Sequence, residues 1–328
     1  MKQIILPLII AIVISSCAGS NKVVVTNRET PSTTGNAQSL VRITSDPVPE
    51  FYPKVSPDGK KLIFHVRDDS KKSTDGSLYS LSTDRFKKWS IMLINLGQPG
   101  RTPLVGEFTQ CPSFYPDSKT IIYSYMKPSK PTIAKSQIDG LSGINYVTSN
   151  SMGDFDSAPV VSPDGKKIAF STTFSGSSQI CTMDMNGMNI TILTEGFKPG
   201  WSPKNKLVYS KLVGKYEQVF TYDLLTGQST QITQGEYNNT DPSFSFDGRY
   251  ITFSSTRDNE NEQIFVMHED GSNIVQLTQG STRNGMPCFG PDQTIYFCSN
   301  AASGKKGTID KLSWTSADIW SIKPVLSR

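Results

Sequence analysis

The sequence of 328 residues predicts an all-β fold: a six-bladed β-propeller with four-stranded blades. Three observations lead to this prediction. A short motif that ends in a Pro-Asp-Gly-like turn occurs six times from residue 53 onward, at intervals of 40 to 59 residues. An apolar strand follows each copy, and further short strands separated by turn residues occupy most of the intervals. Repeats of about 40–45 residues that hold four short strands are typical of propeller blades.

The repeated motif consists of a proline, a hydrophobic position and a tight turn. Proline fixes φ at the first corner of the turn, and Asp-Gly or Asn permits the chain to reverse. The hydrophobic position, which is Trp201 in the fourth copy, is expected to face the core. The six copies span residues 53–59, 112–118, 159–165, 199–205, 242–248 and 287–293. The strands predicted after them span residues 61–64, 120–123, 167–170, 206–209, 250–253 and 294–297.

Two outer strands complete most repeats, and the clearest pair covers residues 263–267 and 274–278. The first repeat is less regular, because either residues 78–81 or residues 91–95 could form its third strand. We favour residues 91–95, since the apolar pair at 104–105 then falls in register as the fourth strand.

The two ends of the chain are predicted to share the sixth blade. That repeat has two strands and a third at residues 318–322, but no fourth strand follows. Residues 40–44, with the sequence Leu-Val-Arg-Ile-Thr, copy the outer strand Ile-Val-Gln-Leu-Thr at residues 274–278. An N-terminal strand that completes the last blade would cover two exposed sheet edges at once.

The first sixteen residues resemble a lipoprotein signal peptide. Lys2 precedes an apolar stretch at residues 4–14 that is too short to span a bilayer comfortably. The sequence Ile-Ser-Ser-Cys at 14–17 resembles the bacterial lipobox, in which small residues precede a cysteine that receives acyl chains such as palmitate. We therefore expect a signal peptide at residues 1–16 and a lipid on Cys17. The alternative is an ordinary signal peptide with a chance cysteine.

Residues 17–39 are expected to form a lipidated, flexible tether, because they are rich in Ser, Thr, Asn and Gly. The propeller would then occupy residues 40–328. Ala18 stands where an aspartate would resemble an inner-membrane retention signal. By analogy with lipoprotein sorting, we expect an outer-membrane anchor with the propeller in the periplasm.

The fifth repeat resembles that of a known family. Its segments Asp-Pro-Ser-Phe-Ser-Phe-Asp-Gly at 241–248, Ile-Thr-Phe-Ser-Ser-Thr-Arg-Asp at 251–258 and Asp-Gly-Ser-Asn at 270–273 resemble the TolB-type propeller repeat. The resemblance covers residues 40 to about 325 and implies the fold more strongly than the function. TolB also has a separate N-terminal domain, whereas only a tether is predicted before the ring here. The resemblance implies a TolB-like lipoprotein of unassigned role.

The sequence contains few features of an enzyme. The Gly-x-Ser-x-Gly motif of serine peptidases is absent, and no Lys/Arg run exceeds two residues, so we do not expect a nucleic-acid partner. His65 and His268 are the two histidines, and they occupy different places in their repeats. His65 aligns with the serines at 124, 171, 210 and 254. We expect no metal site and no cofactor.

Four cysteines follow Cys17. Cys181 aligns with phenylalanines of later repeats and is expected in the apolar core. Cys288 and Cys298 flank one hairpin turn, and an oxidising periplasm would permit a disulfide between them. Cys111 has no obvious partner, and the absence of a C-x-x-C pair argues against redox or zinc chemistry.

Polar residues recur three positions before the motif proline, where the innermost strands begin. They are Glu50, Thr109, Asp156, Asn239 and Asn284, with Gly196 in the fourth repeat. A closed ring would bring them to one channel mouth, where they could hold a cation or an amine of a peptide. Alternatively, they cap turns and bond the local backbone. Arg257, in a loop of the same face, either contacts the ligand or forms an inter-blade ion pair with Asp258.

We expect a monomeric, non-enzymatic binding scaffold that presents one loop face to an envelope protein or peptide. The competing hypothesis is a glycan-active hydrolase or lyase with Glu50 and Asp156 as acid and base. That chemistry requires the two carboxyls to lie about 5–10 Å apart in one pocket. A purely structural component of the envelope is a third alternative.

Overall fold

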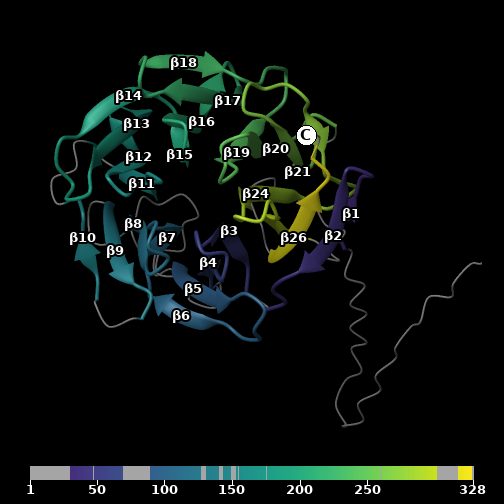
Figure 1. Cartoon of the computed structure of the whole chain (residues 1–328), viewed down its shortest axis with the longest axis horizontal. Coiled ribbons are helices and arrows are strands. Elements are labelled where there is room, and N and C mark those ends of the chain that lie inside the picture. The colour runs from purple at the N-terminus through teal and green to yellow at the C-terminus, as the bar shows by residue number, and fades with distance from the viewer. Residues whose placement is uncertain are drawn as a thin grey trace, which may run out of the picture.

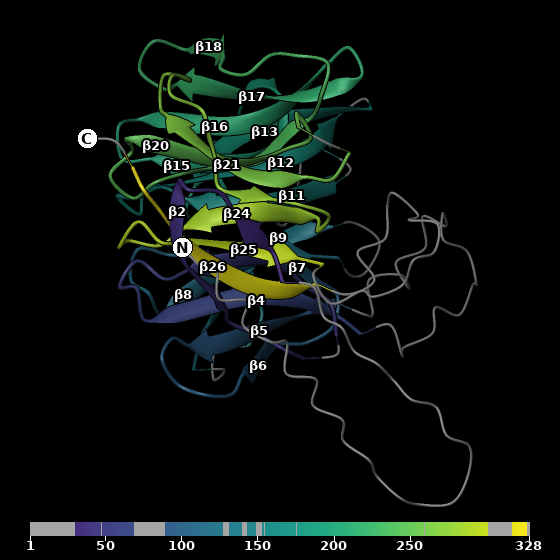
Figure 2. The same ribbon diagram turned by 90° about the vertical axis from the view of Figure 1, so that its right-hand side faces the viewer.

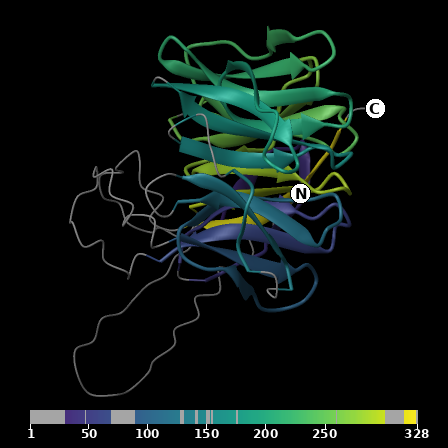
Figure 3. The same cartoon turned by 90° about the vertical axis from the view of Figure 1, so that its left-hand side faces the viewer.

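The computed structural model describes residues 30–46, 48–68, 89–126, 131–139, 143–148, 153, 155–174, 176–258, 260–300 and 317–326. These residues form six four-stranded antiparallel sheets that follow one another around a ring (Figure 1). The prediction of an all-β, six-bladed propeller is therefore confirmed. Seen from the side, the strands run across the thickness of the ring, so each blade has an end on either face (Figures 2 and 3).

The first three blades are each built from consecutive strands, with the first strand next to the channel and the fourth at the rim (Figure 1). Blade 1 contains β3 (Glu50–Val55), β4 (Lys61–Arg67), β5 (Trp89–Asn95) and β6 (Thr102–Val105). Blade 2 contains β7 (Thr109–Phe114), β8 (Thr120–Tyr125), β9 (Thr132–Gln137) and β10 (Asn145–Tyr146). Blade 3 contains β11 (Phe155–Val161), β12 (Lys167–Phe174), β13 (Ser177–Asp184) and β14 (Thr191–Glu195).

The remaining blades follow the same order, except that the last one takes its outer strand from the N-terminal part of the chain. Blade 4 contains β15 (Phe197–Ser202), β16 (Lys206–Val213), β17 (Tyr216–Asp223) and β18 (Gln228–Gln231). Blade 5 contains β19 (Asn239–Phe244), β20 (Tyr250–Ser255), β21 (Gln263–His268) and β22 (Val275–Gln276). Blade 6 contains β24 (Asn284–Phe289), β25 (Ile295–Ser299), β26 (Asp318–Pro324) and β2 (Ala37–Arg42).

The two faces of the ring are defined by the strand registers. Glu50 at the start of β3 lies opposite Val66 near the end of β4, so the innermost strands begin where the second strands end. We call this side the loop face. The opposite side, which carries the motif turns, is the turn face. In blade 1 the turn is held by Ser56, whose hydroxyl donates to Asp58 (2.5 Å), and by Gly59, which adopts a φ of 71°.

Ring closure occurs as predicted, since β2 pairs with β26 in an antiparallel register that places Val41 opposite Ser321. The third strand of blade 1 is β5 and its fourth is β6, as the sequence favoured. The tether boundary at residue 39 is wrong, however, because β2 begins at Ala37 and β1 (Ser32–Thr33) pairs with β23 (Thr278–Gln279) of blade 5. Cys17 and the signal peptide lie outside the described residues.

Each innermost strand carries a bulge at the residue before the motif proline. The ladder between the first and second strands shifts register there in all six blades. The bulged residues all adopt left-handed φ values between 48° and 56°, and none is glycine; they are Tyr52, Cys111, Ala158, Lys198, Asp241 and Met286. Such a conformation costs of the order of 1–3 kcal/mol per residue, so surrounding contacts have to compensate.

The compensating contact comes from the second strand of the preceding blade. The backbone N–H of Cys111 donates to His65 Nδ1 (3.1 Å), and that of Ala158 donates to Ser124 Oγ (3.0 Å). In the same way, the backbone N–H of Lys198 donates to Ser171 Oγ (2.9 Å), and that of Met286 donates to Ser254 Oγ (3.1 Å). This is why the sequence aligns His65 with serines of the other repeats. At the boundary between blades 4 and 5, the equivalent Ser210 hydroxyl has no hydrogen-bond partner among the described residues.

We predict that Ser254→Ala lowers the free energy of unfolding by about 1–3 kcal/mol, because it leaves the buried N–H of Met286 without an acceptor. Ser210→Ala is the matched control: Ser210 occupies the same position in blade 4 and is equally buried, but its hydroxyl has no hydrogen-bond partner. Denaturant unfolding of both variants measures the difference. Equal losses in the two variants would contradict this role of the serine.

Candidate functional site

The polar residues predicted at the channel mouth are buried, with at most 1% of their surface exposed for Glu50, Thr109, Asp156, Asn239 and Asn284. The expectation that they converge on an open mouth is therefore wrong. They lie at the loop-face ends of the innermost strands, as predicted, but the sheets of adjoining blades cover them. Neither cavity in the channel is lined by them.

The two asparagines join neighbouring blades. Asn239 of blade 5 donates through Nδ2 to Oε1 of Gln218 in blade 4 (2.8 Å), and Asn284 of blade 6 donates to Oε1 of Gln263 in blade 5 (2.8 Å). Each glutamine also accepts from the threonine hydroxyl that follows the outer strand of its blade, as Thr278 does for Gln263 (2.8 Å). The buried amide nitrogen of each asparagine thus holds one blade against the next.

At the boundary where the ring closes, Glu50 occupies the position that Asn239 and Asn284 occupy at theirs, but it is a carboxyl group and not an amide. Thr44, which follows β2, donates its hydroxyl to the Glu50 carboxylate and accepts from the backbone N–H of Ile319 (2.8 Å). Arg101 Nη1 lies 2.8 Å from Glu50 Oε1. Burial raises the pKa of Glu50 to about 8 and outweighs the opposing effects of Thr44 and Arg101.

The other mouth residues also bond locally. Thr109 donates to the carbonyl of Gly106 (2.8 Å), and Asp156 Oδ1 accepts from the hydroxyl of Thr172 (2.7 Å). Glu50 and Asp156 are both buried, and neither lines either of the two cavities described in the channel. No described cavity therefore brings together the two carboxyls of the competing acid–base hypothesis.

Arg257 supports a mouth residue and has no carboxylate partner among the described ion pairs. Its Nη2 donates to Asn239 Oδ1 (2.9 Å), and its Nε donates to Ser255 (3.1 Å). The guanidinium lies over the rings of Phe265 and Tyr237, 4.7 and 5.3 Å from their centroids. These contacts do not include the ion pair with Asp258 that the sequence offered as one alternative.

The predicted disulfide is not formed, since Cys288 and Cys298 are both free thiols. The register explains this, because Cys298 lies opposite Gly285 while Cys288 lies opposite Tyr296. The two thiols also pack into different apolar clusters. Cys181 is fully buried in the core, as expected.

His65 is a structural acceptor, and burial followed by the charge of Arg67 lowers its pKa to about 3. It therefore stays neutral and can accept from the N–H of Cys111 at neutral pH. His268 lies in blade 5, not in blade 1 with His65, and its ring packs edge-on against Tyr250 of the same blade. The described residues contain no group of three His, Cys, Asp or Glu that could hold a metal ion.

The narrower cavity of the channel is lined by the six left-handed residues. None of them was predicted as a site residue from the sequence. In this cavity, Lys198 Nζ lies 2.6 Å from Asp241 Oδ1 and 5.6 Å from the ring centroid of Tyr52. Burial opposes the charge of Lys198, but Asp241 keeps its pKa well above the ordinary value. Burial raises the pKa of the Cys111 thiol to about 11, so it is protonated and a poor nucleophile at neutral pH.

A second, wider cavity opens towards the turn face. Its wall is mixed, with Lys54 and four serines (Ser113, Ser162, Ser243 and Ser245) beside turn prolines and aromatic side chains: Pro57, Pro116, Pro163, Pro203, Phe114, Trp201, Phe244, Phe246 and Phe289. Trp201 is only partly buried and lines this cavity, which corrects the expectation that it is wholly in the core. We call this cavity the turn-face funnel. Lys54 lines both the funnel and the narrower cavity.

Comparisons with known proteins agree with this geometry. Residues 197–308, which begin at blade 4, match the TolB beta propeller domain family. The crystal structure of TolB from Acinetobacter baumannii is similar, with a TM-score of 0.61 at 17% identity over 81% of this chain and 64% of that one. By its fold, the chain is a six-bladed β-propeller. More narrowly, residues 197–308 are similar to the TolB beta propeller domain, and the ring is TolB-like in fold.

Two curated proteins share part of the sequence. The uncharacterized protein Atu1656 of Agrobacterium fabrum is 29% identical over 148 residues, which is 43% of this chain and 50% of that protein. The uncharacterized peptidase YuxL of Bacillus subtilis is 32% identical over 108 residues, or 33% of this chain and 16% of the peptidase. The chain therefore spans half or less of the length of these relatives.

Burial of Glu50 predicts an unusual pH dependence of stability. The folded state holds this proton up to a pKa of about 8, whereas the ordinary value is 4.5. The free energy of unfolding should therefore fall as pH rises from 5 to 8, by up to about 1.4 kcal/mol per pH unit. Glu50→Gln should flatten this slope, while Glu195→Gln, at an exposed site, should not. Parallel slopes in wild type and Glu50→Gln would refute this assignment.

Proposed function

We propose that the protein is a lipid-anchored, non-enzymatic binding scaffold of the bacterial envelope. In this proposal Cys17 carries the lipid, the anchor is in the outer membrane, and the propeller lies in the periplasm. The proposal extends the TolB-like fold, which by itself does not specify a partner. The described residues include no helix long and apolar enough to cross a bilayer.

The loop face supports a binding role. The polar residues that could have served an acid–base mechanism there are bonded within and between blades. The same face exposes apolar side chains at the ends of two second strands: Phe174 on β12, and Leu212 and Val213 on β16, are each more than 40% exposed. Exposed apolar groups gathered on one face are typical of protein-binding surfaces. We propose that an envelope protein or peptide docks there.

Lipidation has a direct test. Cells that express the full chain with labelled palmitate should incorporate the label into the wild-type protein, which should fractionate with outer membranes. Cys17→Ala should abolish both the label and the membrane fractionation, because Cys17 is the cysteine directly after the small residues of the lipobox-like segment. Cys111→Ala should leave both intact. Label on the Cys17→Ala protein, or its continued presence in the membrane fraction, would exclude this anchor.

The docking face can be tested by crosslinking in intact cells followed by identification of the partner. We expect the double variant Phe174→Ser/Leu212→Ser to lose most of the crosslinked partner, because it removes apolar contacts without touching buried residues. Met188→Ser is the control, since Met188 is similarly exposed but lies in the turn that follows β13 on the opposite face. Unchanged crosslinking in the double variant would rule out this face.

A further inference from the structure

The turn-face funnel has a feature that the scaffold proposal does not use: a lysine that forms no ion pair with any residue the structure describes. Two lysines line the channel cavities. Lys198 forms an ion pair with Asp241 at 2.6 Å. Lys54 is half-buried, and no carboxylate of the described residues lies within 4 Å of its ammonium group. One of the two channel lysines is therefore available to an anion.

The surroundings of Lys54 determine which anion would fit. Proline rings and aromatic side chains form the larger apolar part of the funnel wall, and among them Trp201 and Phe246 are partly exposed. The indole N–H of Trp201 already donates to the carbonyl of Val160 (3.0 Å), so the rest of the ring offers only apolar surface. A ligand that fills the funnel must therefore be largely apolar and carry its charge at the end that reaches Lys54.

Hydroxyl groups accompany the lysine. Ser113 and Ser243 follow the motif prolines of their blades, as Lys54 does, and both line the funnel. A carboxylate has two oxygens that can accept from an ammonium group and a hydroxyl at the same time. An inorganic anion would also pair with the lysine but would leave the apolar wall without a partner.

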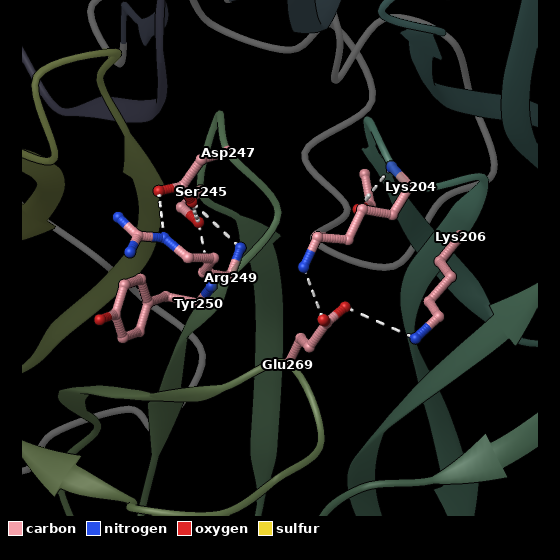
Figure 4. A network of polar contacts seen from close by, with 8 residues as sticks. Lys204, Lys206, Ser245, Asp247, Arg249, Tyr250 and Glu269 are labelled. Atoms are coloured by element: carbon pink, nitrogen blue, oxygen red, sulfur yellow. Dashed lines mark hydrogen bonds and ion pairs between the residues drawn. The ribbon is translucent and has the colours of Figure 1, made fainter. Parts of the chain in front are cut away.

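The rim of the funnel is braced, so little ordering is needed before a ligand binds. Ser118 of blade 2 accepts from the backbone N–H of Asp58 in blade 1 (3.1 Å). Glu269 of blade 5 lies 2.7 Å from Lys204 and 3.5 Å from Lys206 of blade 4 (Figure 4). A preformed cavity of this kind avoids part of the entropic cost of binding.

The turn of blade 5, which carries Phe246, is held from within and from the next blade. Asp247 accepts from Ser245 (2.6 Å) and Arg249 (2.7 Å), as Figure 4 shows. Gln293 of blade 6 also donates to Asp247 (3.0 Å). These contacts fix the position of the partly exposed Phe246 at the mouth of the funnel.

We propose that the turn-face funnel binds a small apolar carboxylic acid, with the carboxylate on Lys54 and the hydrocarbon or aryl group against Trp201 and Phe246. This site is on the opposite face from the proposed docking surface and does not depend on it. Binding involves no covalent step.

The test is titration calorimetry on the folded protein without its signal peptide. Decanoate is the probe, and decanol is its uncharged counterpart. Wild type should bind decanoate at least ten times more tightly than decanol. Lys54→Met should lose this preference but still bind decanol, which also shows that the funnel is intact. Lys54→Arg should keep most of the preference for decanoate, and Phe246→Ser should weaken the binding of both ligands.

Lys166→Met is the matched control, because Lys166 lies on the same face in the turn of blade 3 but outside the funnel, and it should bind as wild type does. Three results would each overturn the proposal: no measurable binding of decanoate, equal affinity for decanoate in wild type and Lys54→Met, or tighter binding of a peptide with an apolar C-terminal residue than of decanoate.

Discussion

The fold depends on one repeated interaction at the centre of the ring. The residue before each motif proline adopts a left-handed conformation, and at four of the six blade boundaries its backbone N–H donates to a side chain on the second strand of the preceding blade. The bulge bends the innermost strand, and the bond fixes the next blade at a set position. Because every bond crosses a blade boundary, the same contact that relieves local strain also holds the ring together.

Closure of the ring reproduces this boundary with residues from the two ends of the chain. Thr44 bonds the backbone of Ile319 as Thr278 bonds that of Ile264 inside blade 5 (2.8 and 2.9 Å). Glu50 then stands where Asn239 and Asn284 stand at other boundaries. Glu50 also contacts Arg101 (2.8 Å), whereas each of the two asparagines bonds a glutamine of the preceding blade.

The sequence predicted the ring well and its interior poorly, for physical reasons. Strand periodicity, Pro-Asp-Gly turns and the copied strand at residues 40–44 are local signals, and each corresponds to an observed element. The left-handed residues could not be predicted, because a residue before proline normally favours extended conformations and none of the six is glycine. The alignment of His65 with four serines was visible, but its meaning depends on the neighbouring blade.

Polar groups that stabilise the ring differ in their sequence pattern from the polar group that is proposed to bind a ligand. Glu50, Asp156, Asn239 and Asn284 are buried and bonded within the protein, so their regular spacing reflects structural roles. Lys54 does not recur, since the corresponding positions hold Ser113, Val160, Gly200, Ser243 and Cys288. In a repeat protein, a charged residue at one position of an otherwise apolar or small series is a better indication of a ligand site than a polar residue present in most repeats.

Native-state hydrogen exchange tests the central claim most directly. The backbone N–H groups of Cys111, Ala158, Lys198 and Met286 line the channel but donate to buried side chains of the preceding blade. We expect them to exchange only through unfolding of the whole ring, at rates close to those of the core strands. Exchange as fast as that of exposed turn residues would contradict the account, because the blades would then be held together without these bonds.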